Sequence, residues 1–356
     1  MPQHCTTILL VIAAIAFPLQ ASESAAQLPD PDGTPADMAK PVQVFIIMGQ
    51  SNTLEMGHVS GGKGGSLEEA VKQEGLYPFM IDESGNWTTR MDVRNVHVMG
   101  SGGPGKAKVK RNDWLTVSGK KIGIEIGIGH QLGHALNEPV LILKSAIGNR
   151  SLGWDLLPPG SQRYEFTDPK DGKTYTYAAH GESPDRWESG TTGEPVKWTA
   201  GIQYIGDVAR ATDVLKQLDQ YYPGARGFEI AGFFYWQGDK DRYDAGHASR
   251  YEHNLVNLIA ALRRDFQAPD APFVCATLGQ TSKESGTGND RLILDAQLAI
   301  SDPERQPELA GSVATVYTNP LSMGSSSNAH YGGNAKTYMN VGLAMGEAMV
   351  QLLAAK

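Results

Sequence analysis

The chain has 356 residues, with 31 basic and 39 acidic side chains and a formal net charge of −8. This length is enough to bury a sizeable core, and the acidic balance, without any long basic run, excludes an ordinary nucleic-acid-binding surface. We therefore expect a globular protein whose partner is neither DNA nor RNA.

The N-terminus predicts export. Residues 8–17 form a run of ten apolar side chains, which suits the core of a signal peptide and is too short to span a bilayer. The usual preceding basic residues are missing, because the first one is Lys40. We expect a signal peptide at 1–26, a linker at 27–41, a periplasmic or secreted location and no integral membrane segment after cleavage. The alternative is a cytoplasmic chain with an apolar tail.

Strand and helix patterns alternate from residue 42 onwards. Strands are expected at 42–48, 139–146, 227–236, 272–278 and 311–318, and helices at 125–137, 203–218, 250–266, 292–300 and 337–353. This order is typical of an α/β fold with a doubly wound, mainly parallel five-stranded sheet and helices on both faces. We expect one domain over 42–356, with two long loop insertions near 57–115 and 155–200.

Three of these strands end in polar turns. The strand at 42–48 runs into residues 49–52, GQSN, where Gly49 permits a sharp turn and Ser51 follows the carboxyl end of the strand. Open α/β sheets bind ligands at that edge, so Ser51 is the candidate nucleophile. The second strand ends near Gly148, in a turn whose backbone N–H groups suit an oxyanion hole. The third ends in Gln237-Gly-Asp-Lys-Asp241.

A histidine, His330, stands shortly before the last predicted helix. A serine hydroxyl is a weak nucleophile unless a histidine accepts its proton, so the same sheet edge offers a Ser51–His330 pair. Two other patterns predict no site. The run at 100–106, GSGGPGK, lacks the Ser or Thr of a phosphate-binding loop, and His130 and His134 lack the glutamate of the metalloprotease motif. No metal or organic cofactor is expected.

These blocks resemble the SGNH-type carbohydrate esterases, the group that includes sialate O-acetylesterases and carbohydrate esterase family 6. GQSN at 49–52 resembles the nucleophile block, the turn from Gly148 to Trp154 a glycine-rich block, and the turn at 235–241 the W-x-Q-G-E-x-D block. Tyr235 and Asp239 replace the tryptophan and glutamate of that last block, and Asn149 replaces a second glycine. The resemblance implies a Ser–His hydrolase that removes O-acetyl groups from carbohydrates.

The resemblance also implies roles for individual residues. The N–H groups of Ser51 and Gly148, with the Gln237 amide, would hold the oxyanion. Four further residues are expected to bind substrate: Gln50, Asn52, Asn149 and Trp154.

The aspartate of the family's D-x-x-H block is missing, since Ser327 stands three residues before His330 and Asn328 two before. Three possibilities follow for the group that orients His330. Asn328 or a backbone carbonyl orients it; Asp239 or Asp241 supplies the carboxylate from the neighbouring strand; or the site is slow or inactive. The first two together are favoured.

The predicted function is a serine esterase that deacetylates a glycan, such as acetylated sialic acid or xylan, through an acyl-enzyme. The alternative is a secreted glycan-binding module with a degenerate esterase site, and a third reading is a lipid or aryl esterase. The insertion at 155–200 carries six aromatic residues, which either stack on sugar rings or form a small core of their own.

Overall fold

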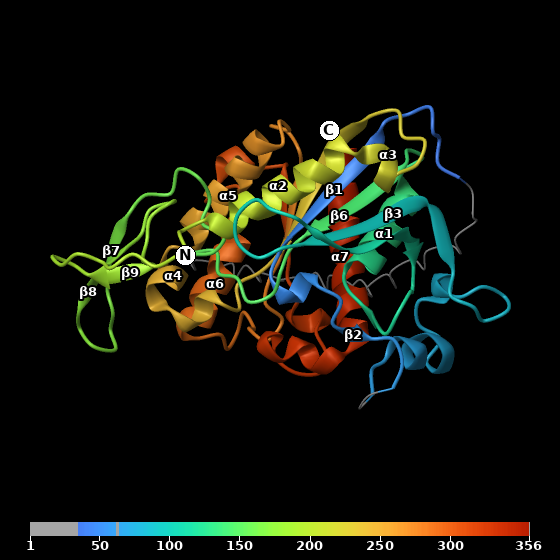
Figure 1. The fold of residues 1–356 in the computed structure, drawn as a ribbon. Helices are drawn as coiled ribbons and strands as arrows, with labels where there is room; N and C mark the ends of the chain where they lie inside the picture. The colour runs from blue at the N-terminus through green and yellow to red at the C-terminus, as the bar shows by residue number, and fades with distance from the viewer. Residues whose placement is uncertain (1–34, 62–63, 356) are drawn as a thin grey trace, which may run out of the picture.

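A seven-stranded sheet forms the centre of the protein (Figure 1). The computed structural model describes residues 35–61 and 64–355. The predicted signal peptide and most of the linker lie outside these residues. The strands of the sheet follow the order β12-β11-β10-β1-β6-β3-β4, and all neighbouring pairs are parallel except β3 and β4. The predicted α/β fold with a mainly parallel sheet is confirmed.

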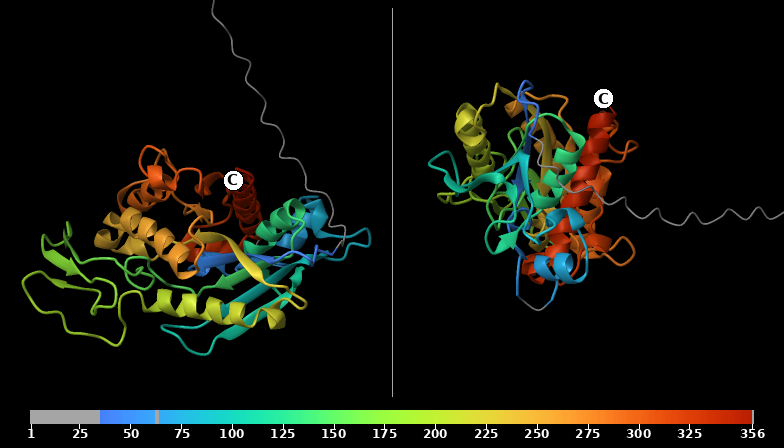
Figure 2. Two further views of the ribbon diagram at one scale, coloured as in Figure 1. Left: turned by 90° about the horizontal axis from the view of Figure 1, so that it is seen from above. Right: turned by 90° about the vertical axis from the view of Figure 1, so that its right-hand side faces the viewer.

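Helices cover both faces of this sheet, as the right-hand view of Figure 2 shows. In β1 (Val42–Gly49), alternate residues point to opposite faces, so Val44 and Ile46 join one core while Phe45 and Ile47 join the other. The first core packs against α2 (Ile202–Lys216), α5 (Tyr251–Asp265) and α6 (Gly288–Ala299). The second packs against α1 (Glu125–Ala135) and α7 (Ala335–Ala354). Burial on both faces explains why β1 is almost wholly apolar.

The winding of the chain reverses beside β1. One neighbour of β1 is β6 (Val140–Ser145), which leads to β3, and the other is β10 (Phe228–Trp236), which leads to β11 (Phe273–Ala276) and β12 (Val313–Val316). The carboxyl ends of β6, β1 and β10 therefore surround a topological switch point, the usual place for a ligand in an open α/β sheet. All three predicted polar turns lie at this place.

The sheet has seven strands where the sequence predicted five. The two missed strands, β3 (Thr89–Met99) and β4 (Lys108–Thr116), come from the segment predicted to be a loop insertion near 57–115. β3 was not recognised as a strand because it contains polar residues, which are buried here together with their partners. Arg90 forms a paired contact with Asp92, and Arg94 donates to the carbonyl oxygens of Tyr221 and Asn112. β4 is an antiparallel edge strand, and charged side chains are typical of such edges.

The second predicted insertion stands outside the main sheet. Residues 155–200 contain a three-stranded antiparallel sheet of β7 (Tyr164–Thr167), β8 (Thr174–Tyr177) and β9 (Arg186–Glu188), which projects to one side in Figure 1. Near its base, Leu157, Ala178 and Ala200 form a small separate core with Trp154 and Trp187 packed against it. Trp187 of this insertion therefore has a structural role.

Short elements complete the described chain. They are β2 (Gly57–His58) paired with β5 (Lys121–Ile122), the helices α3 (Leu218–Tyr221) and α4 (Ala245–Ser249), a π-helical turn η2 (Glu69–Gln73), and the 3₁₀ turns η1 (Ser51–Thr53), η3 (Pro78–Met80), η4 (Asp241–Tyr243), η5 (Pro307–Leu309), η6 (Asn319–Leu321) and η7 (Ser327–Gly333). Among the described residues, no helix has the length and apolar character needed to cross a membrane.

Candidate active site

Ser51 lies at the carboxyl end of β1 because Gly49 allows a turn that other residues resist. Gly49 has φ +144°, and a Cβ on it would come 2.6 Å from the carbonyl oxygen of Trp236 on β10. A side chain therefore clashes with the neighbouring strand in a conformation that L-residues rarely adopt. The chain leaves the sheet here, and Ser51 opens the turn η1 with a half-buried side chain.

The turn after β6 approaches Ser51 closely. A Cβ built on Gly148 would lie 3.5 Å from the Cβ of Ser51. Among the described residues, the backbone N–H groups of Ser51 and Gly148 have no hydrogen-bond acceptor. Asn149, the next residue, is exposed and has a left-handed φ of 57°, which is uncommon for a non-glycine residue and often marks functional turns. Two backbone N–H groups without an acceptor among the described residues therefore lie in neighbouring turns, an arrangement compatible with the predicted oxyanion hole.

His330 lies in η7, which packs beside η1. His330 and Tyr331 both have left-handed backbones, with φ of 51° and 54°. The buried ring of Tyr331 stacks on Trp236 with centroids 5.6 Å apart, and the carbonyl oxygen of His330 accepts from Tyr338. Since Trp236 pairs with Gly49, this stack holds the histidine turn at the end of β10, next to the serine turn.

No described side chain holds either of the two predicted catalytic groups. Within residues 35–61 and 64–355, neither the Ser51 hydroxyl nor the His330 ring has a hydrogen-bond partner. His330 is half-buried and therefore reachable from solvent. Both groups are free to meet a substrate, and catalytic hydrogen bonds commonly tighten only in the complex.

The Gln237 amide is fully buried and engaged with protein groups. Its Nε2 lies 3.0 Å from Gln50 Oε1, 2.9 Å from the Arg150 carbonyl oxygen and 2.6 Å from Asp241 Oδ2. Its Oε1 accepts from the hydroxyl of Tyr251 at 2.8 Å. Three acceptors compete for two N–H hydrogens, so in this conformation the amide ties the turns of β1, β6 and β10 together. Gln50, predicted to bind substrate, is buried within the same network.

Asp241 fixes the turn after β6. Its Oδ2 accepts from the Leu152 N–H at 2.8 Å and its Oδ1 accepts from the Gly153 N–H at 2.7 Å. The side chain is fully buried, and burial raises the pKa of Asp241 above its ordinary value, although these hydrogen bonds and the nearby His247 favour the ionised form. In the described chain Asp241 therefore holds loop backbone, and none of its hydrogen bonds reaches His330.

Asp239 is hydrogen-bonded to the histidine turn, whereas Asn328, within that turn, is bonded to Ser326. Asp239 Oδ1 accepts a hydrogen bond of 2.6 Å from the Ser327 hydroxyl, and Arg242 lies 3.6 Å from the same oxygen. Asn328 is exposed, and its Oδ1 accepts from the Ser326 hydroxyl at 2.6 Å. The predicted contact between Asn328 and His330 is absent from the described residues.

The remaining predicted substrate-binding residues differ in their surroundings. Asn52 is fully buried beside Ser51, and both polar atoms of its side chain lack a partner among the described residues. Trp154 is half-buried and packs against the small core of the insertion. Asn52 is therefore the more unusual of the two, because buried amides nearly always have partners.

Sequence reasoning missed Arg150, which borders the site. Its Nε donates to Gln203 Oε1 at 3.1 Å, a terminal nitrogen donates to the Ser101 hydroxyl at 2.8 Å, and its guanidinium lies 5.0 Å from the Trp198 ring centroid. Arg150 thus joins the turn after β6 to the loop at 100–105 and to the insertion. The only available signal was a charged residue inside a polar turn, which most surface turns share.

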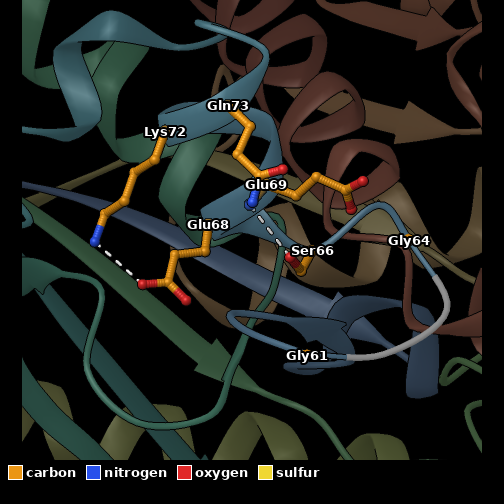
Figure 3. A pocket seen from close by; sticks show the side chains of 7 residues that line it. All are labelled: Gly61, Gly64, Ser66, Glu68, Glu69, Lys72 and Gln73. Carbon is orange, nitrogen blue, oxygen red and sulfur yellow. Dashed lines mark hydrogen bonds and ion pairs between the residues drawn. The ribbon is translucent and has the colours of Figure 1, made fainter.

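A pocket opens on the segment between β2 and η3 (Figure 3). Polar side chains line it, and two contacts order them: Glu69 N–H donates to the Ser66 hydroxyl, and Lys72 pairs with Glu68 at 3.1 Å. None of the predicted site residues lines this pocket, and no residue of the Ser51 turn does. The neighbouring Gly65 carbonyl oxygen accepts from Ala335 N–H at the start of α7.

The fold is of the α/β class with a mainly parallel central sheet, and the predicted nucleophile follows its first central strand. Residues 177–351 match the family model described as carbohydrate esterase, sialic acid-specific acetylesterase. The match includes the Gln237 turn and His330 but begins after Ser51 and Gly148. It confirms the resemblance found in the sequence and supports carbohydrate O-acetylesterase activity.

Solved structures with a similar fold share little sequence with this chain. A carbohydrate acetylesterase from Xanthomonas citri has a TM-score of 0.53 and 14% identity over 88% of this chain, which spans 57% of that protein. A protein from Arabidopsis thaliana has a TM-score of 0.47 and 17% identity, covering 87% of this chain and 98% of its own. NanS has a TM-score of 0.38 and 15% identity over 78% of each chain. A search of curated proteins found no match.

Proposed function

We propose that this carbohydrate O-acetylesterase works through an acyl-enzyme on Ser51. The observation that supports this most directly is the close approach of Gly148 to Ser51: a Cβ built on Gly148 would lie 3.5 Å from the Ser51 Cβ, at the edge where the His330 turn also packs. Nucleophile, backbone donors and a titratable ring come from three separate parts of the chain. Such convergence is expected of a catalytic site and not of a simple surface turn.

The first half of the reaction transfers the acetyl group to the enzyme. The Ser51 oxygen attacks the ester carbonyl carbon while His330 takes the hydroxyl proton. The carbonyl oxygen becomes negatively charged and is stabilised by the N–H groups of Ser51 and Gly148. When the intermediate collapses, the bond to the sugar oxygen breaks, and His330 gives its proton to that oxygen. The sugar leaves with a free hydroxyl, and an acetyl ester remains on Ser51.

Water completes the cycle. His330 takes a proton from a water molecule, whose oxygen attacks the acetyl carbonyl carbon at the same oxyanion site. Collapse of this second intermediate breaks the bond to Ser51 and releases acetate, and the serine recovers its proton from His330. Asp239 supplies negative charge on the histidine side of the site, while Asp241, Gln237 and Gln50 hold the turns in place.

The substrate is an acetylated glycan, with acetylated sialic acid and xylan as the two classes to test first. Asn149 is exposed beside the oxyanion turn, and Asn52 is a buried amide without a partner in the described chain, so both are proposed to contact the sugar. Trp154 borders the same turn. We also propose that residues 1–26 direct export to the periplasm or the exterior.

The second candidate is a glycan-binding module with a degenerate site. It is favoured by one observation, namely that no described carboxylate contacts the His330 ring. Acetate release from p-nitrophenyl acetate and from acetylated sialosides and xylan separates the two readings. The Ser51→Ala variant should release no acetate, while Ser60→Ala, a change at an exposed serine in the same segment, should match the wild type. Equal inactivity of all three with retained glycan binding supports the module, and a preference for medium-chain esters supports a lipid esterase.

A further inference from the structure

Ser327 is a buried hydroxyl that none of the assignments above uses. It is fully buried at the start of η7, and its hydroxyl donates to Asp239 Oδ1 at 2.6 Å. Its own N–H donates to Gln280 Oε1 at 3.3 Å. An O–H bond of this length to a carboxylate belongs to the strong, charge-assisted class, and burial removes the competition from water. Asp239 and Ser327 therefore form one fixed unit.

This unit and a second anchor hold His330 from both sides. Ser327 precedes the histidine by three residues in the same short turn, in which the chain bends at His330 because His330 has a left-handed backbone. Tyr331 follows the histidine directly and stacks on Trp236. Both anchors reach the end of β10, through Asp239 and Trp236, which are three residues apart. The histidine turn is thus tied twice to the strand that borders Ser51.

Asp239 is the carboxylate that the described chain connects to this turn. No described carboxylate oxygen lies within 4 Å of the His330 ring, and the hydrogen bond to Ser327 is the connection that Asp239 makes to η7. Arg242, 3.6 Å from Asp239 Oδ1, also pairs with Asp290 at 3.1 Å, so it only partly balances the charge of Asp239. A catalytic histidine needs a partner that holds its ring in the right tautomer. Because Asp239 does not contact the His330 ring, it can orient the ring only through an intermediate group.

We propose that Ser327 is a positioning residue that links Asp239 to His330 during turnover. This inference rests on the proposed acyl-enzyme function. The Ser327 hydroxyl donates to Asp239, and its free lone pair accepts the N–H of the His330 ring when the ring turns toward Ser51. No proton passes along this path, because Ser327 keeps its proton and His330 exchanges protons only with Ser51, the sugar oxygen and water. This chain of hydrogen bonds, the Asp239–Ser327–His330 relay, fixes the tautomer of the His330 ring and raises its proton affinity.

The test is an exchange of the two groups. Ser327→Ala should lower kcat about 10- to 100-fold with little change in KM, and should move the acid limb of the kcat/KM profile to lower pH, because the ring loses the carboxylate's support. Asp239→Ser and Ser327→Asp should each lower kcat at least as much. The double variant Asp239→Ser/Ser327→Asp restores one hydroxyl and one carboxylate with their places exchanged, and should recover kcat to within about tenfold of wild type.

Three controls keep the outcomes separate. Ser325→Ala removes an exposed neighbouring hydroxyl and should leave kcat and the pH profile unchanged. Thermal unfolding of every variant identifies those that fail to fold. The inference is overturned if Ser327→Ala keeps the wild-type kcat and acid limb, or if a folded double variant is no better than the single ones. If the wild type itself releases no acetate, the proposed function fails instead, and nitrogen NMR of the His330 ring then decides: the relay requires one ring tautomer in wild type and a mixture of both in Ser327→Ala.

Discussion

Gly49 and Trp236 face each other where β1 and β10 end, so closely that a Cβ on Gly49 would stand 2.6 Å from the Trp236 carbonyl oxygen. Trp236 carries the stacked ring of Tyr331 on its side chain. The end of β10 therefore positions both turns. The Trp236 backbone limits the path of the serine turn, and the Trp236 ring holds the histidine turn. The relative position of the proposed nucleophile and base depends on this contact region.

Gly49→Ala should therefore destabilise the protein and abolish the activity. The left-handed side of φ space costs about 1–3 kcal/mol, and relief of the clash with Trp236 adds about 1–3 kcal/mol. We expect a loss of about 2–6 kcal/mol in the free energy of unfolding, measured by chemical denaturation, and no detectable acetate release. The control is Gly105→Ala, where an added Cβ meets no atom within 4 Å and stability should change by less than about 0.5 kcal/mol. Equal stability of both variants would contradict a tight contact at Gly49.

Gly148→Ala should separate catalysis from stability. An added Cβ would lie 3.5 Å from the Ser51 Cβ and 3.9 Å from a methyl group of Leu54, which are ordinary contacts. The methyl group occupies space beside the nucleophile, so an incoming ester should bind in a less favourable position. We expect kcat/KM to fall at least about tenfold, because small misplacements at a reacting centre are costly, while the melting temperature stays the same. A loss of stability without a loss of kcat/KM would place Gly148 outside the site.

The sequence predicted the parts of the site but not the way in which they are connected. Apolar runs such as β1 and β10 were predictable because both of their faces are buried, and the serine and histidine turns followed from their places after a strand and before a helix. β3 was not predictable, because the burial of Arg90 and Arg94 depends on partners that the pattern along the strand does not reveal. For the same reason Asp239 looked like a direct partner of the histidine, although its hydrogen bond goes to Ser327.

The pH dependence of stability should contain a contribution from His247. Burial alone would lower the pKa of His247, but the hydrogen bond to Asp185 at 2.9 Å and the charges of Asp185, Asp241 and Asp244 raise it to about 9. A pKa that is higher in the folded state stabilises the protein fully below the unfolded value of about 6.5, and this stabilisation is lost as the pH rises through 9. The linkage corresponds to at most about 3 kcal/mol.

Thermal unfolding between pH 6 and pH 10 measures this contribution. His247 holds Asp185 of the insertion and packs its ring against Gly153, so the wild type should lose stability between pH 7 and pH 10. His247→Gln should remove most of that slope. His253→Gln serves as the control, since the exposed His253 has a pKa below its ordinary value and does not titrate in this range. A slope that persists unchanged in His247→Gln would assign the pH dependence to another group.

Lys144 and Glu125 test how a buried ion pair behaves in this sheet. Lys144 is fully buried on β6, with its Nζ 2.6 Å from Glu125 Oε2 and 3.7 Å from Glu55 Oε1. Burial opposes ionisation of Glu55, but Lys144 and His97 hold the pKa of Glu55 well below its ordinary value. Lys144→Met leaves the buried Glu125 carboxylate without its cation, and should cost about 3–5 kcal/mol of unfolding free energy.

The double variant Lys144→Met/Glu125→Gln should be less destabilised than the sum of the single changes, because it removes the uncompensated charge together with its partner. Lys40→Met provides the contrast, since the pair of Lys40 with Glu138 is partly exposed and should contribute only about 0–1 kcal/mol. Chemical denaturation of the four variants gives the coupling free energy directly. Strict additivity of the two buried changes would mean that Lys144 is held by Glu55 and the surrounding dipoles and not by Glu125.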